Sequence, residues 1–267
     1  MTSAGSDADR VALVTGAGRG IGAAVVHRLA GAGWRVVAVD ACADHPDLPY
    51  RMASHDELDA VAAAHPGTVR TVVADVRDQP AMHAAVATAV GEFGGLDAAV
   101  ASAAVMAGGT PAWEATDAQW DALYEVGLRG VLHLVRAAVP ALLARPEPRS
   151  GRFVALASAA AHHGLYHLAP YCAVKHGVLG LVRGLAADLR GTGVTAAAVS
   201  PGSADTAMLA ATAALYGLAT PAEFAGHQLV DRLLDPDEVA AAVCWLCGPD
   251  SGAVTGTAVR ADGGFLG

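Results

Sequence analysis

The sequence predicts a single α/β domain, built as a doubly wound parallel sheet of seven strands with helices on both faces. Seven Val- and Ala-rich runs are apolar throughout, which is typical of parallel strands buried on both faces. Helix-like segments lie between most of these runs, and such alternation builds a parallel sheet. No Pro- or Gly-rich break divides the 267 residues, a length that suits one domain.

The elements follow one another along the chain. The expected strands are residues 10–15, 35–39, 69–74, 98–101, 152–157, 194–199 and 254–259. The expected helices are residues 21–33, 55–64, 80–93, 117–144, 171–190 and 236–247. Thr116 with Gln119 has capping-box spacing, and Asp235 precedes a proline at the first helical position. Residues 204–234 have no strand pattern, so we expect a helical flap over a site there.

Composition excludes several classes of function. Lys plus Arg number 17 against 26 Asp plus Glu, and a net charge of −9 argues against a nucleic-acid surface. The polar residues 1–9, which we expect to be a disordered tail before the domain at 10–267, lack the features of a signal peptide. No uncharged apolar run reaches the ~18 residues of a membrane span. We therefore expect a cytoplasmic protein that binds neither nucleic acid nor membrane.

No metal site is expected. Cys244 and Cys247 have CxxC spacing, but they lie in an apolar, Ala-rich segment and have no second pair of ligands, which indicates helix core. His162, His163 and His167 are close in sequence, but no carboxylate or cysteine completes a ligand set.

The turn after the first strand is rich in glycine and opens the first helix. It reads Thr15-Gly16-Ala17-Gly18-Arg19-Gly20-Ile21-Gly22. Glycines allow positive φ and close backbone approach, and the free N–H groups of a helix N-terminus suit a pyrophosphate. The position of this turn predicts a dinucleotide site.

Two acidic residues extend the predicted site. Asp40 ends the second strand, where a carboxylate accepts hydrogen bonds from an adenosine ribose and repels a 2′-phosphate, which favours NAD. Arg19 favours NADP instead, so that alternative stays open. Asp75 and Val76 close the third strand, where they could contact the adenine.

The reaction site is predicted around Tyr171, Lys175 and Ser158. Tyr171 and Lys175 are four residues apart in a predicted helix, so both side chains share one face. An adjacent cation lowers the pKa of a phenol from ~10 and lets it act as a base. Ser158 ends the fifth strand, where its hydroxyl could bind a substrate oxygen.

With these motifs in this order, residues 10–267 resemble the short-chain dehydrogenases/reductases, which have a Rossmann-like fold. Ser158 lies 13 residues before Tyr171, the usual spacing of that family. The match further includes Pro201-Gly202 and the terminal Asp262-Gly263-Gly264.

The resemblance implies an NAD-dependent alcohol dehydrogenase. Tyr171 would be the general base or acid, Lys175 would lower its pKa and bind ribose hydroxyls, and Ser158 would orient the substrate oxygen. The implied cofactor contacts are Gly16, Gly18, Arg19, Gly20, Ile21, Gly22, Asp40, Ala41, Asp75, Val76, Ser102, Ala103, Ala104, Tyr171, Lys175, Pro201, Gly202, Ala204 and Thr206. It also implies a homotetramer packed through the helices 117–144 and 171–190.

Two departures from the family pattern concern asparagine, which this sequence lacks. The Asn-Asn-Ala-Gly motif of the family reads Ala101-Ser102-Ala103-Ala104. Gly127 stands where the family has the asparagine that supports a proton-relaying water. Glycine could keep a kink and a free carbonyl there. These departures leave open a catalytically weak NAD-binding sensor or scaffold.

A third departure is the length of 35 residues from Asp40 to Asp75, several more than usual. The extra stretch, about residues 41–52, resembles an insertion in the mycofactocin-coupled branch. In that branch the insertion covers a retained NAD, and electrons pass to mycofactocin. An ordinary enzyme with exchangeable NAD and a long loop is the alternative.

The substrate is expected to be an apolar alcohol or ketone. His162 and His163 lie between Ser158 and Tyr171, in a segment that borders the substrate in the family. The pocket candidates are His162, His163, Met208 and Tyr216, with Trp113, Met106 and Leu209 as further apolar candidates.

Overall fold

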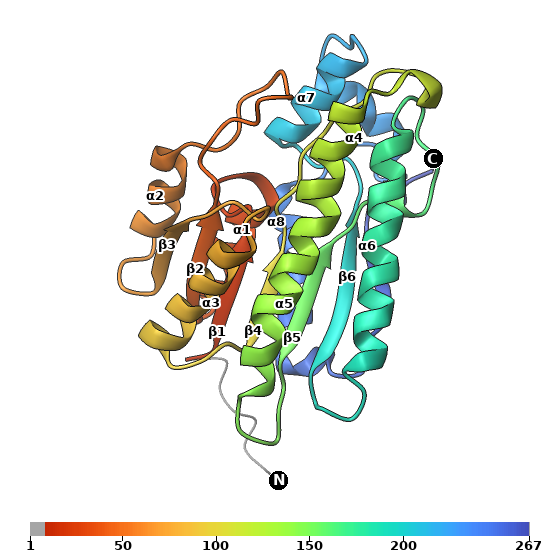
Figure 1. The fold of residues 1–267 in the computed structure, drawn as a ribbon. Helices are drawn as coiled ribbons and strands as arrows, with labels where there is room; N and C mark the ends of the chain where they lie inside the picture. Colours follow the sequence, from red (N-terminus) through yellow and green to blue (C-terminus); the bar gives the residue numbers. More distant parts are fainter. Residues whose placement is uncertain (1–8, 267) are drawn as a thin grey trace.

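The computed structural model describes residues 9–266 and contains one seven-stranded sheet in the order β3-β2-β1-β4-β5-β6-β7 (Figure 1). All six neighbouring pairs of strands are parallel. The strands are β1 (Val11–Thr15), β2 (Arg35–Asp40), β3 (Val69–Val73), β4 (Ala98–Ala101), β5 (Arg152–Leu156), β6 (Thr195–Pro201) and β7 (Ala258–Ala261). The predicted fold class is confirmed. The expected tail at 1–9 lies, except for Asp9, outside the described residues.

Helices alternate with the strands. They are α1 (Gly20–Gly31), α2 (His55–Ala63), α3 (Gln79–Phe93), α4 (Asp117–Tyr124), α5 (Gly130–Leu143), α6 (Ala169–Asp188), α7 (Ala207–Leu215) and α8 (Pro236–Cys247). Short turns of other helix types are η1 (Ala112–Glu114), η2 (Glu125–Arg129), η3 (Ala159–Ala161), η4 (Pro221–His227) and η5 (Pro249–Ser251). Both predicted capping signals, at Thr116 and Asp235, form capping boxes.

Two apolar layers hold the sheet between its helices. Helices α3, α5 and α6 cover one face, in a core that includes Leu13 and Phe153 (Figure 1). Helices α1 and α8 cover the other face, where Trp34 is buried, and α2 packs at the β3 edge. Each fully buried Leu or Phe stabilises the fold by about 1.5–3 kcal/mol, so an all-apolar strand pattern stabilises both layers at once.

Two elements differ from the sequence prediction. The last strand is β7 at Ala258–Ala261 rather than 254–259, because Gly256 has a φ of +64° and belongs to the preceding turn. The helix expected at 117–144 is divided by the π-helical turn η2. The whole stretch Asp117–Leu143 has the length and apolarity of a membrane span, but half of its most apolar window is buried within the domain.

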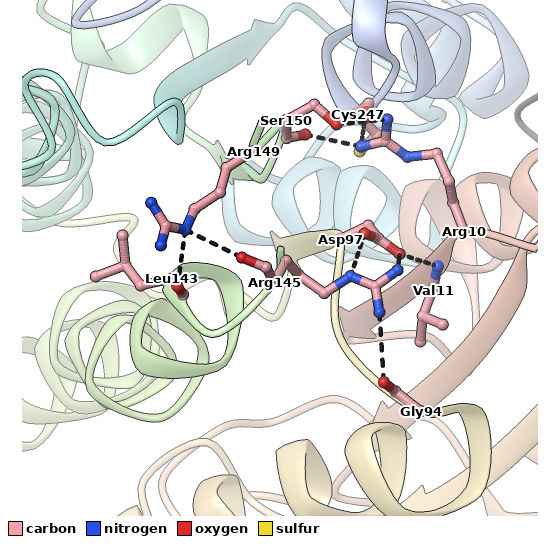
Figure 2. Close-up of polar contacts among 9 residues, drawn as sticks. All are labelled: Arg10, Val11, Gly94, Asp97, Leu143, Arg145, Arg149, Ser150 and Cys247. Carbon is pink, nitrogen blue, oxygen red and sulfur yellow. Dashed lines mark hydrogen bonds and ion pairs between the residues drawn. The ribbon is translucent and has the colours of Figure 1, made fainter. Parts of the chain in front are cut away.

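A polar network joins segments at the amino ends of the central strands (Figure 2). The Asp97 carboxylate accepts from the Val11 N–H over 2.9 Å and pairs with Arg145 at 2.8 Å. Arg10 donates to the Ser150 carbonyl over 2.8 Å. These contacts fix the end of the sheet opposite the site described below.

The carboxyl ends of β1 and β4 meet where the strand order reverses. The chain runs outward from β1 through β2 to β3, and then returns to place β4 on the other side of β1. In open parallel sheets, ligands bind in the crevice at such a reversal.

Candidate active site

A cavity of about 760 Å³ opens at this crevice. Of the residues predicted for the site, it is lined by Gly16, Arg19, Gly20, Ile21, Gly22, Asp40, Ala41, Asp75, Val76, Ser102, Ala103, Ala104, Ser158, Tyr171, Lys175, Pro201, Gly202, Ala204, Thr206, Met208 and Tyr216. Gly18, His162 and His163 are not among its lining residues. The fold thus brings the glycine-rich turn and the predicted reaction residues to the same cavity.

The glycine-rich turn is shaped by close backbone contacts. Gly16 has a φ of +65°, and a Cβ there would lie 2.7 Å from the Ala103 Cα. A Cβ at Gly22 would lie 2.0 Å from the Gly16 carbonyl oxygen, so only glycine lets α1 start this close to β1. The first N–H groups of α1 therefore face the cavity, as a bound pyrophosphate requires.

Asp40 stands beside this turn. One carboxylate oxygen accepts from the Gly18 N–H over 2.9 Å, and the other from the Cys42 N–H over 3.3 Å. Gly18 thus positions the carboxylate rather than lining the cavity. Arg19, which lines the cavity, donates to the Arg51 carbonyl over 2.5 Å.

Asp75 forms an ion pair that the sequence did not predict. Its carboxylate accepts from the Arg77 guanidinium at 2.6 Å, and the bonds to Arg77 lower the Asp75 pKa against the effect of burial. The same guanidinium lies 3.1 Å from Nε2 of His45, in the stretch inserted after β2. Arg77 and His45 both line the cavity.

The segment after β4 is held by a threonine, although the family's asparagines are replaced. The Thr15 hydroxyl accepts from the N–H groups of Ser102 and Ala103 over 3.2 and 3.3 Å, and donates to the Val100 carbonyl. Thr15 is buried at the end of β1. A β1 side chain therefore fixes the backbone that faces Gly16.

Ser158, Tyr171 and Lys175 meet at the floor of the cavity. The Ser158 hydroxyl accepts from the Ala160 N–H over 3.1 Å, and its interaction with the Tyr171 phenol lowers the pKa of that group. Lys175 lies one turn further along α6, with its Nζ 5.7 Å from the centre of the Tyr171 ring. Both α6 side chains are buried.

The pKa of Tyr171 differs from the sequence expectation, which was a lowered value. Burial raises the pKa of Tyr171 to about 12, and the interaction with Ser158 offsets only part of that rise. Burial also lowers the pKa of Lys175 to about 8. The Lys175 ammonium donates to the Leu156 carbonyl over 2.9 Å rather than to the phenol.

Gly127 lies in the π-helical turn η2, against α6. A Cβ on this buried residue would come within 2.9 Å of the Val174 side chain. Val174, the neighbour of Lys175, thus occupies the space that the side chain of an asparagine would need at this position. The wide π turn, a frequent feature of functional sites, marks the break in the long helix.

The segment 41–52, which we call the insertion, contributes residues that sequence reasoning did not assign to the site. Figure 1 shows this connection between β2 and α2 rising above the sheet toward α7. The Tyr50 hydroxyl accepts from the Met106 N–H over 2.6 Å, and both residues line the cavity. The tyrosine in this insertion was the available signal.

The two histidines predicted for the substrate pocket make other contacts in this structure. His162 turns to the buried Ser200 hydroxyl, 2.9 Å from its Nε2. His163 packs against Phe265, with ring centroids 5.7 Å apart. Trp113, another candidate, is 84% exposed and lies outside the lining, whereas Met106 and Leu209 belong to it. Sequence reasoning missed Phe224, His227 and Phe265, which line the outer cavity.

Known proteins match this chain over nearly its whole length. A family model described as enoyl-(acyl carrier protein) reductase matches residues 16–266. The chain is 32% identical over 270 residues to (-)-trans-carveol dehydrogenase of Rhodococcus erythropolis, with 96% of each chain covered. It is 35% identical over 260 residues to cis-4-hydroxycyclohexanecarboxylate dehydrogenase of Sinomonas cyclohexanicum, with 97% of each chain covered.

A solved structure shares the fold over the same length. Carveol dehydrogenase from Mycobacterium avium, in complex with NAD, superimposes with a TM-score of 0.91 at 30% identity. The match covers 98% of this chain and 99% of that one. The chain therefore belongs to the short-chain dehydrogenase/reductase family of oxidoreductases.

Proposed function

We propose that this protein is an NAD-dependent dehydrogenase that interconverts an alcohol and its carbonyl compound, with Tyr171 as acid and base. The observation that carries the proposal is one cavity that joins a buried Ser158–Tyr171–Lys175 set to a glycine-rich helix start. NAD, when bound, supplies the hydride acceptor at its nicotinamide ring. The N–H groups at the start of α1 would hold its pyrophosphate, and the segment from Pro201 to Thr206 would hold its nicotinamide.

The chain's own residues would handle the proton. Ser158 binds the substrate oxygen and keeps it beside the Tyr171 phenol, whose pKa the Ser158 hydroxyl lowers. Tyr171 removes the hydroxyl proton when the alcohol is oxidised, and returns it when the carbonyl compound is reduced. Lys175 holds a positive charge beneath the phenol and favours its deprotonated form.

The Asp40 carboxylate favours NAD over NADP. This carboxylate, fixed by the Gly18 N–H, would repel the additional phosphate of NADP. Arg19, the cation that favours NADP, lines the same cavity and donates one N–H to the Arg51 carbonyl, so the choice rests on Asp40. Binding of NAD to the Mycobacterium avium relative agrees with this choice.

We further propose that NAD is retained and that mycofactocin is the external electron acceptor. The insertion is tied across the cavity at three places: Arg19 to Arg51, Arg77 to His45, and Met106 to Tyr50. In this proposal, the nucleotide lies beneath these contacts and leaves only when they open. A cofactor held in this way needs a second molecule to reoxidise it between turnovers.

The cavity lining and the relatives both support one class of substrate. Apolar side chains such as Leu165, Met208 and Leu209 line the cavity that also contains Tyr171, which suits an apolar alcohol or ketone. Carveol and cis-4-hydroxycyclohexanecarboxylate, named for two relatives, are both ring alcohols. We propose a secondary alcohol on a carbon ring.

The proposed assembly is a homotetramer in the cytoplasm. Its interfaces would be the outer faces of the α4–α5 stretch and of α6. Trp120 on α4 is 43% exposed, and a contact with a second copy would cover such a side chain. Sedimentation analysis of the purified protein would distinguish a tetramer from a monomer.

Release of the bound nucleotide tests the cofactor assignment. The protein is purified without added nucleotide and desalted, then denatured, and the supernatant is analysed by mass spectrometry. About one NAD per chain is expected. NADP, or no nucleotide at all, would contradict the retained-NAD proposal. No nucleotide together with rapid turnover on added NAD would favour an ordinary exchanging enzyme.

A further inference from the structure

The carboxyl-terminal segment, residues 262–266, folds back onto the flap (residues 204–234). Backbone hydrogen bonds run from Leu229 to Gly264 at 3.1 Å, from Val230 to Gly263 at 3.2 Å and from Leu266 to His227 at 2.9 Å. Gly263 and Gly264 have φ values of +62° and +75°, so the turn needs glycine at both positions. The end of the described chain is thus part of the cavity wall.

Gln228 ties this paired structure to the segment proposed to hold the nicotinamide. Its buried side chain accepts from the Ser203 N–H over 2.9 Å and donates to the Ser203 and Arg232 carbonyls. A Cβ on Gly202 would lie 2.2 Å from its Oε1, which leaves little freedom between the two segments. Gln228 therefore fixes the position of the flap relative to the segment around Gly202 and Ser203.

Phe265 is placed in the cavity by this arrangement. It stands opposite Gln228 in an antiparallel bridge and lines the cavity together with His227, whose ring centroid is 6.2 Å away. The series continues from His227 to Phe224 at 5.9 Å, and from Phe224 to Tyr216 at 6.1 Å. These four rings, from Tyr216 to Phe265, form what we call the aromatic wall.

The charges of the cavity are segregated along its length. Arg19, Asp40, Asp75 and Arg77 lie around the glycine-rich turn, and Lys175 lies beneath Tyr171. Over the described residues, the flap and the carboxyl-terminal segment add no Asp, Glu, Lys or Arg to the lining. A charged group on a substrate would therefore lose water at the aromatic wall without gaining an ion pair with a carboxylate, ammonium or guanidinium there.

We propose that Phe265 is a specificity-determining residue, and that the aromatic wall selects uncharged ring substrates over open-chain ones. This inference rests on the proposed dehydrogenase function. A rigid ring contacts flat aromatic side chains over a large area without losing internal rotations, whereas an open chain must give up several to do so. Loss of the Phe265 ring should therefore slow the oxidation of a ring alcohol more than the oxidation of an open-chain alcohol.

The test compares cyclohexanol with 2-hexanol, two secondary alcohols of six carbons. In Phe265→Ala, we expect the second-order rate constant for reduction of the bound NAD in a single turnover to fall about tenfold with cyclohexanol and to change little with 2-hexanol. Phe93→Ala is the matched control, because Phe93 lies on α3 and outside the cavity lining. 4-Hydroxycyclohexanecarboxylate, tested at neutral pH, should be a poorer substrate than cyclohexanol.

The possible outcomes distinguish failure of the Phe265 proposal from failure of the proposed dehydrogenase function. If the wild type oxidises both alcohols and Phe265→Ala keeps the same ratio, or if the carboxylate is preferred, the inference is wrong and the function stands. If the wild type oxidises neither alcohol, the dehydrogenase proposal fails for this substrate class. Calorimetric titration with cyclohexanone still tests the wall in that case, since binding needs no turnover. Weaker binding of cyclohexanone to Phe265→Ala but not to Phe93→Ala would support the role of Phe265. Equal binding to the wild type and to Phe265→Ala would overturn that role.

Discussion

The Met106 N–H donates to the Tyr50 hydroxyl over 2.6 Å, and this bond joins the insertion to the segment that follows β4. Tyr50 is mostly buried, and burial raises its phenol pKa even though the bond from Met106 opposes that rise. The phenol therefore stays neutral near pH 7 and keeps a proton that it can donate into the cavity. The bond spans the crevice in which we propose that NAD is retained.

Tyr50→Ala should speed the release of NAD, because it removes both the aromatic ring and the acceptor of the Met106 bond. A hydrogen bond contributes about 0.5–1.5 kcal/mol net, so its loss alone corresponds to a release rate up to about tenfold higher. Stopped-flow fluorescence of bound reduced cofactor, chased with excess oxidised NAD, measures this rate. Tyr124→Ala is the control, since Tyr124 on α4 lies outside the cavity lining. Equal release from both variants would contradict a retaining role for the insertion.

Tyr171 should impose a rising pH profile on alcohol oxidation. Its pKa is raised to about 12 in the cofactor-free site, and only the deprotonated phenol accepts a proton. The rate of the chemical step should therefore rise with pH, by up to about tenfold per unit, until it meets the pKa of the loaded enzyme. Tyr171→Phe should lose turnover but keep its NAD. A variant that still turns over with the same profile would remove Tyr171 from the mechanism.

Lys175→Met should stabilise the cofactor-free protein while it abolishes turnover. Burial lowers the pKa of Lys175 from 10.5 to about 8, so the folded state binds this proton less well than the unfolded chain does. The free energy of unfolding therefore increases as pH rises from about 8 to 10.5. Below pH 8 the full penalty of ~3 kcal/mol remains. Methionine avoids that penalty but leaves the Leu156 carbonyl without its donor, at a cost of about 1 kcal/mol.

Thermal unfolding of the cofactor-free protein at pH 7 and pH 10 measures this effect. We expect the gap in Tm between Lys175→Met and the wild type to be larger at pH 7 and to shrink by pH 10. A variant less stable than the wild type at both values would show that Lys175 stabilises the fold.

Gly127→Asn should destabilise the protein even though it restores the side chain common in the family. Its Cβ would lie 2.9 Å from the Val174 side chain, and overpacking of this kind costs about 1–3 kcal/mol. Val174→Ala should relieve that cost in the double variant. Urea unfolding of the two single variants and the double variant measures the coupling, and strictly additive effects would contradict the contact.

Much of this architecture could be predicted because its signals are local. Apolar runs marked the strands, and the spacing of Tyr171 and Lys175 indicated a shared helix face. The direction of a side chain depends on distant partners instead: Ser200 draws His162 away from the cavity, and Arg77 engages both Asp75 and His45. Phe265 lines the cavity only because its segment pairs with the flap, a contact between segments far apart in the sequence.

A single mixing experiment shows whether retained NAD and Tyr171 carry out alcohol oxidation together. The purified protein is mixed with cyclohexanol, without any added acceptor, and the near-ultraviolet absorbance of reduced nicotinamide is followed. We expect one rapid burst of at most one equivalent per chain, which added NAD does not extend and Tyr171→Phe does not show. Continuous turnover on added NAD, or a burst that survives Tyr171→Phe, would contradict this mechanism.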